Sequence, residues 1–120
     1  MRIVAMRFVF FETLLFTRLL PQYLDDEGYQ ALQHALMARP KQGPVITGTG
    51  GFRKLRWRDK RRGKGRRGGL RVIYYFLELE HQVWFFTVYN KDEIEDLTAA
   101  QCRLLRNAIR EELRVRRGNG

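Results

Sequence analysis

Residues 52–58 and 70–78 flank a basic, glycine-rich loop, and apolar residues alternate with basic or polar ones along both stretches. Such alternation predicts two β-strands. From Arg53 to Arg71 the chain carries eleven Lys and Arg in nineteen residues, with Asp59 the single acid among them. This density of positive charge is typical of a surface that binds a polyphosphate. Because strands carry much of the charge, we expect it on a folded sheet and not on a disordered tail.

Composition indicates a folded protein with an anionic partner. The 120 residues are 44% hydrophobic and include 23 Lys and Arg against 13 Asp and Glu, which gives a net charge of +10. This balance favours nucleic acid, the ribosome or an acidic protein as the partner, and an anionic membrane surface less so. We expect one domain over residues 1–120, with residues 1–6 as an N-terminal extension and residues 117–120 as a flexible tail.

Other features exclude several classes of protein. Cys102 is the single cysteine, so an internal disulfide is excluded and a reducing compartment is expected. Together with the distant His34 and His81 it does not make a ligand set, and we expect neither a metal nor a cofactor. No segment approaches the ~18–20 apolar residues of a membrane span, so we expect a cytoplasmic protein.

Hydrophobic periodicity and capping residues predict seven elements in the order β-α-α-β-β-β-α. Thr13 caps a first helix, which Pro21 ends or kinks near Leu20. Thr98 and Gln101 form a capping box for the last helix. The predicted bounds are strand 7–12, a helix from residue 14, helix 26–38, strands 52–58, 70–79 and 82–89, and helix 99–116. This order predicts an α+β domain with one antiparallel-rich sheet and a tight hairpin near residues 80–81.

Alternation sorts the strand side chains onto two faces of this sheet. One face is predicted to be apolar core, formed by Leu55, Trp57, Val72, Tyr74, Phe76, Trp84, Phe86 and Val88. The other face is cationic toward one end, where it carries Lys54, Arg56, Arg71 and Tyr89, with Lys91 just beyond the last strand. In the first helix, Leu15, Phe16 and Leu20 either complete the core or form an exposed apolar stripe for a partner.

The cationic end has the side chains that cleavage of RNA by its own 2′-hydroxyl requires. The chain contains no serine, which excludes a Ser-His-Asp set, and its carboxylates cluster mostly away from the basic face. A lysine among other cations can take a proton, arginines can stabilise the phosphorane oxygens, and a tyrosine or lysine can protonate the leaving 5′-oxygen. A plain binding surface without catalysis is the alternative.

We therefore predict two sets of functional residues, although which residue acts as base and which as acid stays open. The predicted catalytic residues are Lys54, Arg56, Arg71, Tyr89 and Lys91. The predicted RNA-binding residues are Arg58, Lys60, Arg61, Arg62, Lys64, Arg66 and Arg67.

Four segments occur in a specific order along the chain. They read GTGGFRKLRW at 48–57, GKGRRGGLRVIYY at 63–75, VYNKDE at 88–93 and DLT at 96–98. As an ordered series they resemble the RelE/ParE superfamily of bacterial toxins, and most closely its HigB-type, RelE-like branch. The resemblance runs from about residue 7 to about residue 113. It implies the RelE-like fold, whose element order agrees with the one predicted above.

The resemblance also implies an activity and its partners. Members are ribosome-dependent endoribonucleases that cut mRNA in the 30S A site, and each is neutralised by a cognate antitoxin. We expect the antitoxin to be a helix-turn-helix DNA-binding protein and the free toxin to be a monomer. Two alternatives stay open: a ParE-like toxin that inhibits gyrase by binding, and a non-catalytic ribosome- or RNA-binding module.

The family's functional residues are carried over position by position. Its basic pair, its phosphate-binding arginine and the basic residue after its last strand fall on Lys54, Arg56, Arg71 and Lys91. The C-terminal tyrosine of the founding branch falls near Leu97, so this chain departs from the pattern there. Tyr89 is taken as the substitute for that tyrosine.

Overall fold

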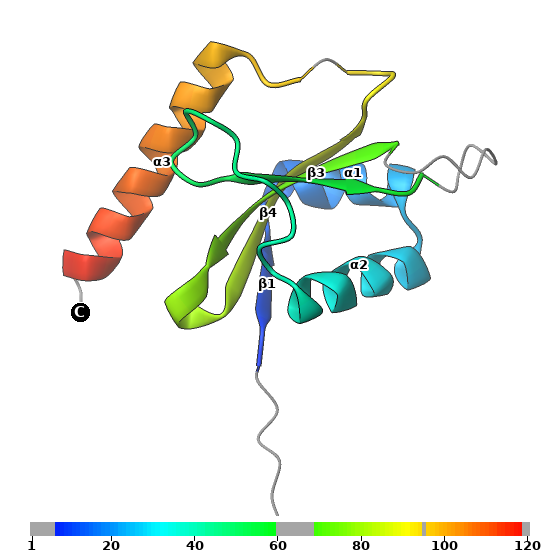
Figure 1. The fold of residues 1–120 in the computed structure, drawn as a ribbon, viewed down its shortest axis with the longest axis horizontal. Helices are drawn as coiled ribbons and strands as arrows, with labels where there is room; N and C mark the ends of the chain where they lie inside the picture. The colour runs from blue at the N-terminus through cyan, green and yellow to red at the C-terminus, as the bar shows by residue number, and fades with distance from the viewer. Residues whose placement is uncertain (1–6, 60–68, 95, 119–120) are drawn as a thin grey trace, which may run out of the picture.

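The computed structural model describes residues 7–59, 69–94 and 96–118. Its helices and strands follow the predicted order (Figure 1), with α1 and α2 after the first strand and α3 at the end. The elements are β1 Val9–Glu12, α1 Leu14–Tyr23, α2 Asp26–Ala38, β2 Arg53–Trp57, β3 Leu70–Leu77, a 3-10 turn Glu78–Glu80, β4 Gln82–Asn90 and α3 Ala99–Gly118. The predicted α+β class is confirmed. None of the helices within the described ranges is both long and apolar enough to cross a membrane.

The four strands form one sheet in the order β1-β4-β3-β2. β1 pairs with β4 in parallel, and the other two pairings are antiparallel. The β3–β4 ladder contains a bulge, because Ile73 pairs with Thr87 while the next residue, Tyr74, pairs with Phe85. Phe86 is therefore an extra residue in β4, and a single extra residue reverses the alternation of side chains on either side of it.

The face of the sheet toward α1 and α2 carries the larger core. Its buried members are Phe16, Tyr23, Leu32, Leu36, Leu55, Leu70, Val72, Tyr74, Val83, Phe85 and Val88. Phe16 stacks on Phe85 with ring centroids 4.7 Å apart and completes the core, and the half-buried Leu20 also packs against it. Leu15 is 45% exposed. The Tyr74 hydroxyl is satisfied inside this core by donating to the carbonyl of Pro40.

The opposite face packs against α3 through a smaller core. This core consists of Phe52, Ile73, Tyr89, Leu105 and Ile109, with Phe86 packed against it. Trp84 also lies on this side, since its ring stacks 4.9 Å below the guanidinium of Arg116 in α3. The prediction that Trp84 and Phe86 share the face of Val88 was wrong. Phe86 is the extra residue of the bulge and Trp84 precedes it, and both lie on the face toward α3.

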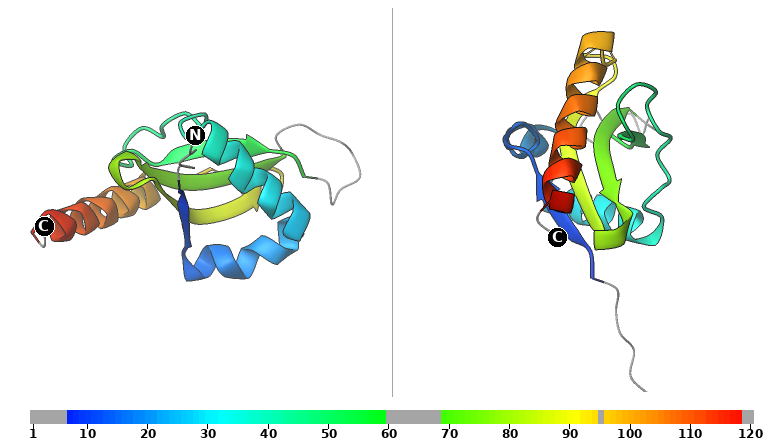
Figure 2. Two further views of the ribbon diagram at one scale, coloured as in Figure 1. Left: turned by 90° about the horizontal axis from the view of Figure 1, so that it is seen from below. Right: turned by 90° about the vertical axis from the view of Figure 1, so that its left-hand side faces the viewer.

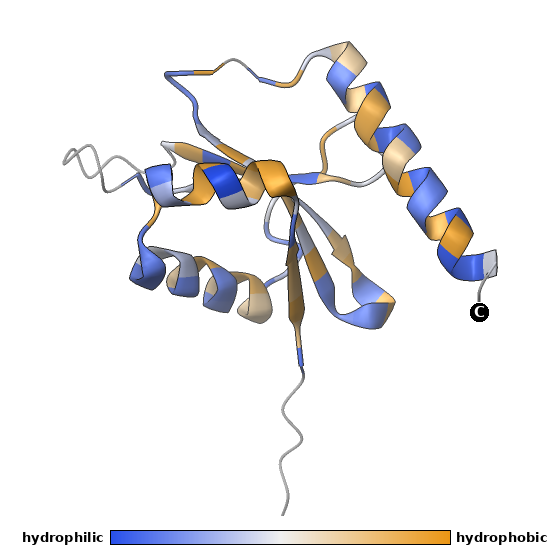
Figure 3. Cartoon of the chain, turned by 180° about the vertical axis from the view of Figure 1, so that it is seen from behind, coloured by the Kyte–Doolittle hydropathy of each residue, from blue (hydrophilic) through white to orange (hydrophobic). Residues whose placement is uncertain are grey.

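α3 is amphipathic, with hydrophobic and hydrophilic residues recurring along its length (Figure 3). It extends to one side of the sheet, away from α1 and α2 (Figure 2). The chain before β2 approaches it closely at Gly50, where a Cβ atom would lie 3.1 Å from Ile109, and Gly50 has a φ of 76°. A glycine is needed at such a position, because other residues rarely adopt a positive φ.

Several element ends differ from the predicted ones. α1 runs to Tyr23 despite Pro21, because Tyr23 is buried in the core and anchors the last turn. α3 continues to Gly118, two residues into the predicted tail. Strand β3 stops at Leu77, and the expected tight hairpin is a 3-10 turn closed by His81 at a φ of 53°. By contrast, α2 has the predicted bounds, with Asp25 accepting from the Gly28 amide as its N-cap.

Candidate functional site

A small cavity of about 220 Å³ lies on the α3 side of the sheet, at the end where β3 begins and β4 finishes. It brings together all five predicted catalytic residues and adds two others. Its lining is Lys54, Arg56, Arg71, Tyr89, Lys91, Ile94 and Asp96. We call it the cationic cavity, because four of these residues are basic and one is acidic.

The strand register explains why the side chains meet. Arg56 on β2 pairs with Arg71 on β3, and Arg71 pairs with Tyr89 on β4, so the three form one row across the sheet. Directly paired residues have Cβ atoms about 4.5–5.5 Å apart on the same face. Lys54 lies two residues before Arg56 and so shares this face. Three adjacent strands thus aim cationic or phenolic groups at one place.

Asp96 connects two of these groups. Its Oδ2 lies 2.7 Å from the Lys54 Nζ, and its Oδ1 accepts a hydrogen bond of 2.8 Å from the Tyr89 hydroxyl. Hydrogen bonds from Lys54 and then Tyr89 lower the pKa of the Asp96 carboxyl, with a further contribution from the charge of Arg71. The carboxylate is therefore ionised over the whole neutral range.

Tyr89 is held as a protonated phenol. Burial raises its pKa most, and the hydrogen bond to Asp96 and the charge of that carboxylate raise it further. The nearby Arg71 acts in the opposite direction, but the net pKa stays above the ordinary value of tyrosine. At neutral pH the Tyr89 hydroxyl is consequently a proton donor.

The strand ends that carry the cavity are tied together by buried polar groups. Asp59, the single acid of the basic run, is 2% exposed and accepts a 2.6 Å hydrogen bond from the amide of Asn90. The backbone amide of Lys91 donates to the carbonyl of Gly69 at 3.0 Å. These contacts join the chain after β2, the start of β3 and the end of β4. Asp59 therefore has a structural role in holding the site together.

Of the predicted RNA-binding residues, the structure describes only Arg58. Arg58 is exposed directly after β2. The other predicted RNA-binding residues, Lys60, Arg61, Arg62, Lys64, Arg66 and Arg67, lie outside the described residues. Arg53 has a structural contact, since its guanidinium donates to the carbonyls of Lys41 and Gly43.

Sequence reasoning missed Asp96 and Ile94. The expectation that carboxylates gather mostly away from the basic face does not hold for Asp96, which lies inside the cavity. The nearest signal in the sequence is the capping box, in which Thr98 and Gln101 exchange hydrogen bonds and mark the start of α3 at Ala99. It places Asp96 in the eight-residue connection between β4 and α3 but does not predict where its side chain points.

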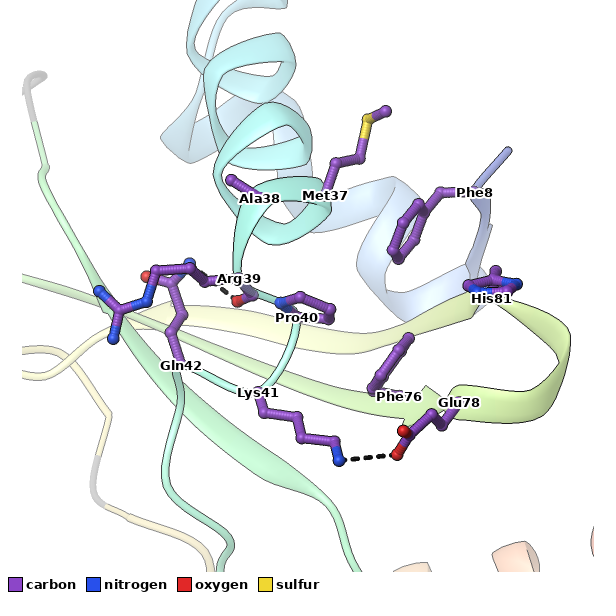
Figure 4. Close-up of a pocket in the computed structure, with 10 residues that line it drawn as sticks. All are labelled: Phe8, Met37, Ala38, Arg39, Pro40, Lys41, Gln42, Phe76, Glu78 and His81. Atoms are coloured by element: carbon purple, nitrogen blue, oxygen red, sulfur yellow. Dashed lines mark hydrogen bonds and ion pairs between the residues drawn. The ribbon is translucent and has the colours of Figure 1, made fainter. Parts of the chain in front are cut away.

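Two further cavities lie in other places. One, of about 510 Å³, is formed by the end of α2 and the turn after β3, where Lys41 pairs with Glu78 at 2.7 Å and Phe76 lies beside Phe8 (Figure 4). It contains none of the predicted site residues. The other, of about 580 Å³, is largely apolar and lies between β4 and α3. This apolar groove shares Tyr89 and Ile94 with the cationic cavity and is lined by Leu15, Phe86, Thr87, Tyr89, Ile94, Leu97, Gln101, Leu104, Leu105 and Ala108.

The architecture has a counterpart among solved structures. It is similar to that of the Escherichia coli toxin RelE, in a double arginine-to-alanine mutant determined in the free state, with a TM-score of 0.51. The match covers 75% of this chain and 90% of the other, at 14% sequence identity. The chain has a RelE-like fold. No protein-family model matches the sequence. At this level of identity the RelE-like fold is what the two proteins share, and the roles of individual side chains need their own argument.

Proposed function

We propose that the chain is the toxin of a type II toxin-antitoxin system and acts as an endoribonuclease on mRNA bound to the ribosome. The observation that carries this proposal is the cationic cavity, in which three neighbouring strands direct Lys54, Arg56, Arg71 and Tyr89 toward one point. The RelE-like fold supports the class, and the ordered motifs favour its HigB-type branch. In this proposal the whole chain is one toxin domain that works in the cytoplasm, where ribosomes are.

The reaction that fits these groups is attack of an RNA 2′-oxygen on the adjacent phosphorus. The 2′-hydroxyl gives its proton to a base, the bond from phosphorus to the 5′-oxygen breaks, and that oxygen takes a proton. The products are a 2′,3′-cyclic phosphate and a free 5′-hydroxyl. Arg56 and Arg71, paired across β2 and β3, would stabilise the equatorial oxygens of the transition state. Neither the attack on phosphorus nor the two proton transfers require a metal ion.

Tyr89 is the best proton donor for the leaving oxygen. Its raised pKa keeps the hydroxyl protonated at neutral pH, and a group in that state can act as an acid but not as a base. The Nζ of Lys54, at 2.7 Å from a carboxylate oxygen, lies where it would contact phosphate oxygens beside the two arginines. Lys91 is exposed at the edge of the cavity, where it would contact the neighbouring phosphate.

The apolar groove is the proposed contact for the antitoxin. Leu104 in α3 is 68% exposed, Ile94 is 49% exposed and Leu15 in α1 is 45% exposed, and all three line this groove. Exposed apolar patches of this kind mark protein–protein contacts. Because the groove shares Tyr89 and Ile94 with the cationic cavity, an antitoxin seated there would also cover the cavity. Neutralisation would then be a direct block.

The test is induction of the protein in bacteria, followed by primer extension on an abundant transcript. Cuts that appear only when the transcript is translated are the expected result. The same experiment is repeated with a start-codon mutant of the transcript, which the ribosome does not read, as the control. Growth arrest with intact mRNA and a DNA-damage response would favour a ParE-like toxin that acts on gyrase by binding, and would reject the nuclease.

A further inference from the structure

One carboxylate enters the cationic cavity from the loop between β4 and α3. Each oxygen of Asp96 has its own partner, with the Tyr89 hydroxyl at 2.8 Å on Oδ1 and the Lys54 ammonium at 2.7 Å on Oδ2. Lys54 is on β2 and Tyr89 is on β4, and β3 lies between these strands. The carboxylate thus joins two groups that the sheet alone holds apart.

Four of the other six residues that line the cavity around Asp96 are basic. Lys54 comes from β2, Arg56 and Arg71 come from β2 and β3, and Lys91 comes from the same loop as Asp96. The Asp96 side chain is 65% exposed, whereas that of Lys54 is 27% exposed. Of the two partners, Asp96 is therefore the one that solvent and an incoming anion reach more easily.

Resting on the proposed function, we propose that Asp96 is a positioning residue whose carboxylate holds Lys54 and Tyr89 in place until an RNA phosphate replaces it. A phosphate offers the same kind of anionic oxygen acceptors to a lysine and a phenol. Groups already ordered by Asp96 would need little reorganisation when the phosphate arrives, and such preorganisation favours the chemical step. The Asp96 carboxylate then gives up Lys54 and Tyr89 to the phosphate as the substrate enters.

This exchange predicts opposite effects on binding and on chemistry. The carboxylate repels an incoming phosphate, so its removal should strengthen RNA binding. It also orders the two reacting groups, so its removal should slow cleavage. A residue with a merely structural role would change both in the same direction, or neither.

The experiment compares Asp96→Asn with Asp92→Asn, which removes the same charge from the same loop but lies outside the cavity. Binding is measured by fluorescence anisotropy with a fully 2′-O-methylated RNA oligonucleotide, which is not cleaved. Cleavage is measured in single turnover on mRNA-programmed ribosomes. We expect Asp96→Asn to bind roughly twofold to tenfold more tightly at low salt and to cleave at least about tenfold more slowly. The Asp92→Asn protein should stay within about twofold of wild type in both.

Unchanged or weaker RNA binding by Asp96→Asn, or cleavage at the wild-type rate, would overturn the proposal. If the wild-type protein itself does not cleave, the proposed function fails, and a separate measurement decides the positioning role. NMR titration of the Asp96 carboxyl carbon should show its pKa rising when Lys54 is replaced in Lys54→Met. The same Asp96 pKa in wild-type and Lys54→Met proteins would overturn the proposal whatever the cleavage result.

Discussion

The face of the sheet that α1 and α2 cover is filled by stacked aromatic and aliphatic side chains, whereas the face toward α3 combines a smaller core with an open, charged cavity. On the first face the buried tyrosine hydroxyl of Tyr74 bonds to backbone groups of the loop after α2. On the second face, the Tyr89 hydroxyl donates to the exposed carboxylate of Asp96, beside the basic side chains of β2 and β3. One face therefore supplies stability, and the other keeps its polar groups available to a ligand.

The comparison shows how a small domain can carry a dense positive charge without losing its fold. The basic side chains of the cavity lie on the face of the sheet opposite the larger core, so the strands that carry them are fixed from the other side. Substitutions on the two faces should accordingly separate stability from activity.

Phe85→Ala should be the most damaging change to stability. Phe85 is fully buried and stacks on Phe16 at 4.7 Å and on Phe10 at 5.7 Å. Removing a buried aromatic ring leaves a cavity and typically costs about 3–5 kcal/mol of unfolding free energy. Urea denaturation measures this loss, and Phe11→Ala on the exposed side of β1 is the control, expected to cost less than about 1.5 kcal/mol. Equal losses for the two variants would contradict the account of the larger core.

Arg71→Ala should abolish activity and leave the fold intact. Loss of one preorganised donor to a developing phosphorane charge typically costs about 10²–10³ in rate. Arg71 is partly exposed, and we expect less than about 1 kcal/mol of lost stability. The matched control is Arg18→Ala, which removes an exposed cation from α1, outside the cavity. Growth of induced cultures at equal expression reports the result, and a fully toxic Arg71→Ala would show that the site is misassigned.

Tyr89→Phe should slow cleavage by about a hundredfold while keeping the ring in the α3 core, because only the proton donor is lost. Single-turnover cleavage measures the rate, and urea denaturation checks the fold. Tyr75→Phe changes a second, half-buried tyrosine on the same face, outside the cavity, and serves as the control. A wild-type rate for Tyr89→Phe would remove Tyr89 from the mechanism without affecting the role of Arg71.

Acid should remove the small contribution that the Asp96 carboxylate makes to stability on the charged face. The folded state lowers the pKa of Asp96, so the folded protein binds its proton less readily than the unfolded chain, whose Asp has a pKa of about 3.9. The contribution is present above that value and is lost as the pH falls through the lower folded pKa. Because the side chain is 65% exposed, we expect less than about 1 kcal/mol. Stability curves of wild type and Asp96→Asn should converge in acid, and a constant gap would contradict this.

Local signals in the sequence predicted much of the fold. Asp25 and the Thr98–Gln101 capping box mark helix starts by hydrogen bonds within four residues, and both are present. Alternation also placed Lys54, Arg56, Arg71 and Tyr89 on one face, because those positions lie on the same side of the bulge. The failures involve contacts distant in sequence. Trp84 and Phe86 changed face because one extra residue sits opposite β3, a register that only strand pairing determines.

Asp96 was missed for a related physical reason. Within an irregular connection, no periodicity indicates where a side chain points, so its direction depends on the groups that it meets. Here these are Lys54 and Tyr89, 42 and 7 residues away in the chain. Similarly, Tyr23 keeps the last turn of α1 helical after Pro21 through burial that helix propensity does not encode.

The most direct test of the central claim is the chemistry of the RNA ends. Purified protein is added to ribosomes programmed with a defined mRNA, and the termini of any fragments are identified by mass spectrometry. We predict cuts that require the ribosome and leave a 2′,3′-cyclic phosphate and a 5′-hydroxyl, with both absent for Arg71→Ala. Intact mRNA, or fragments that carry a 5′-phosphate, would contradict the assignment of the cationic cavity as a site of cleavage by the RNA's own 2′-oxygen.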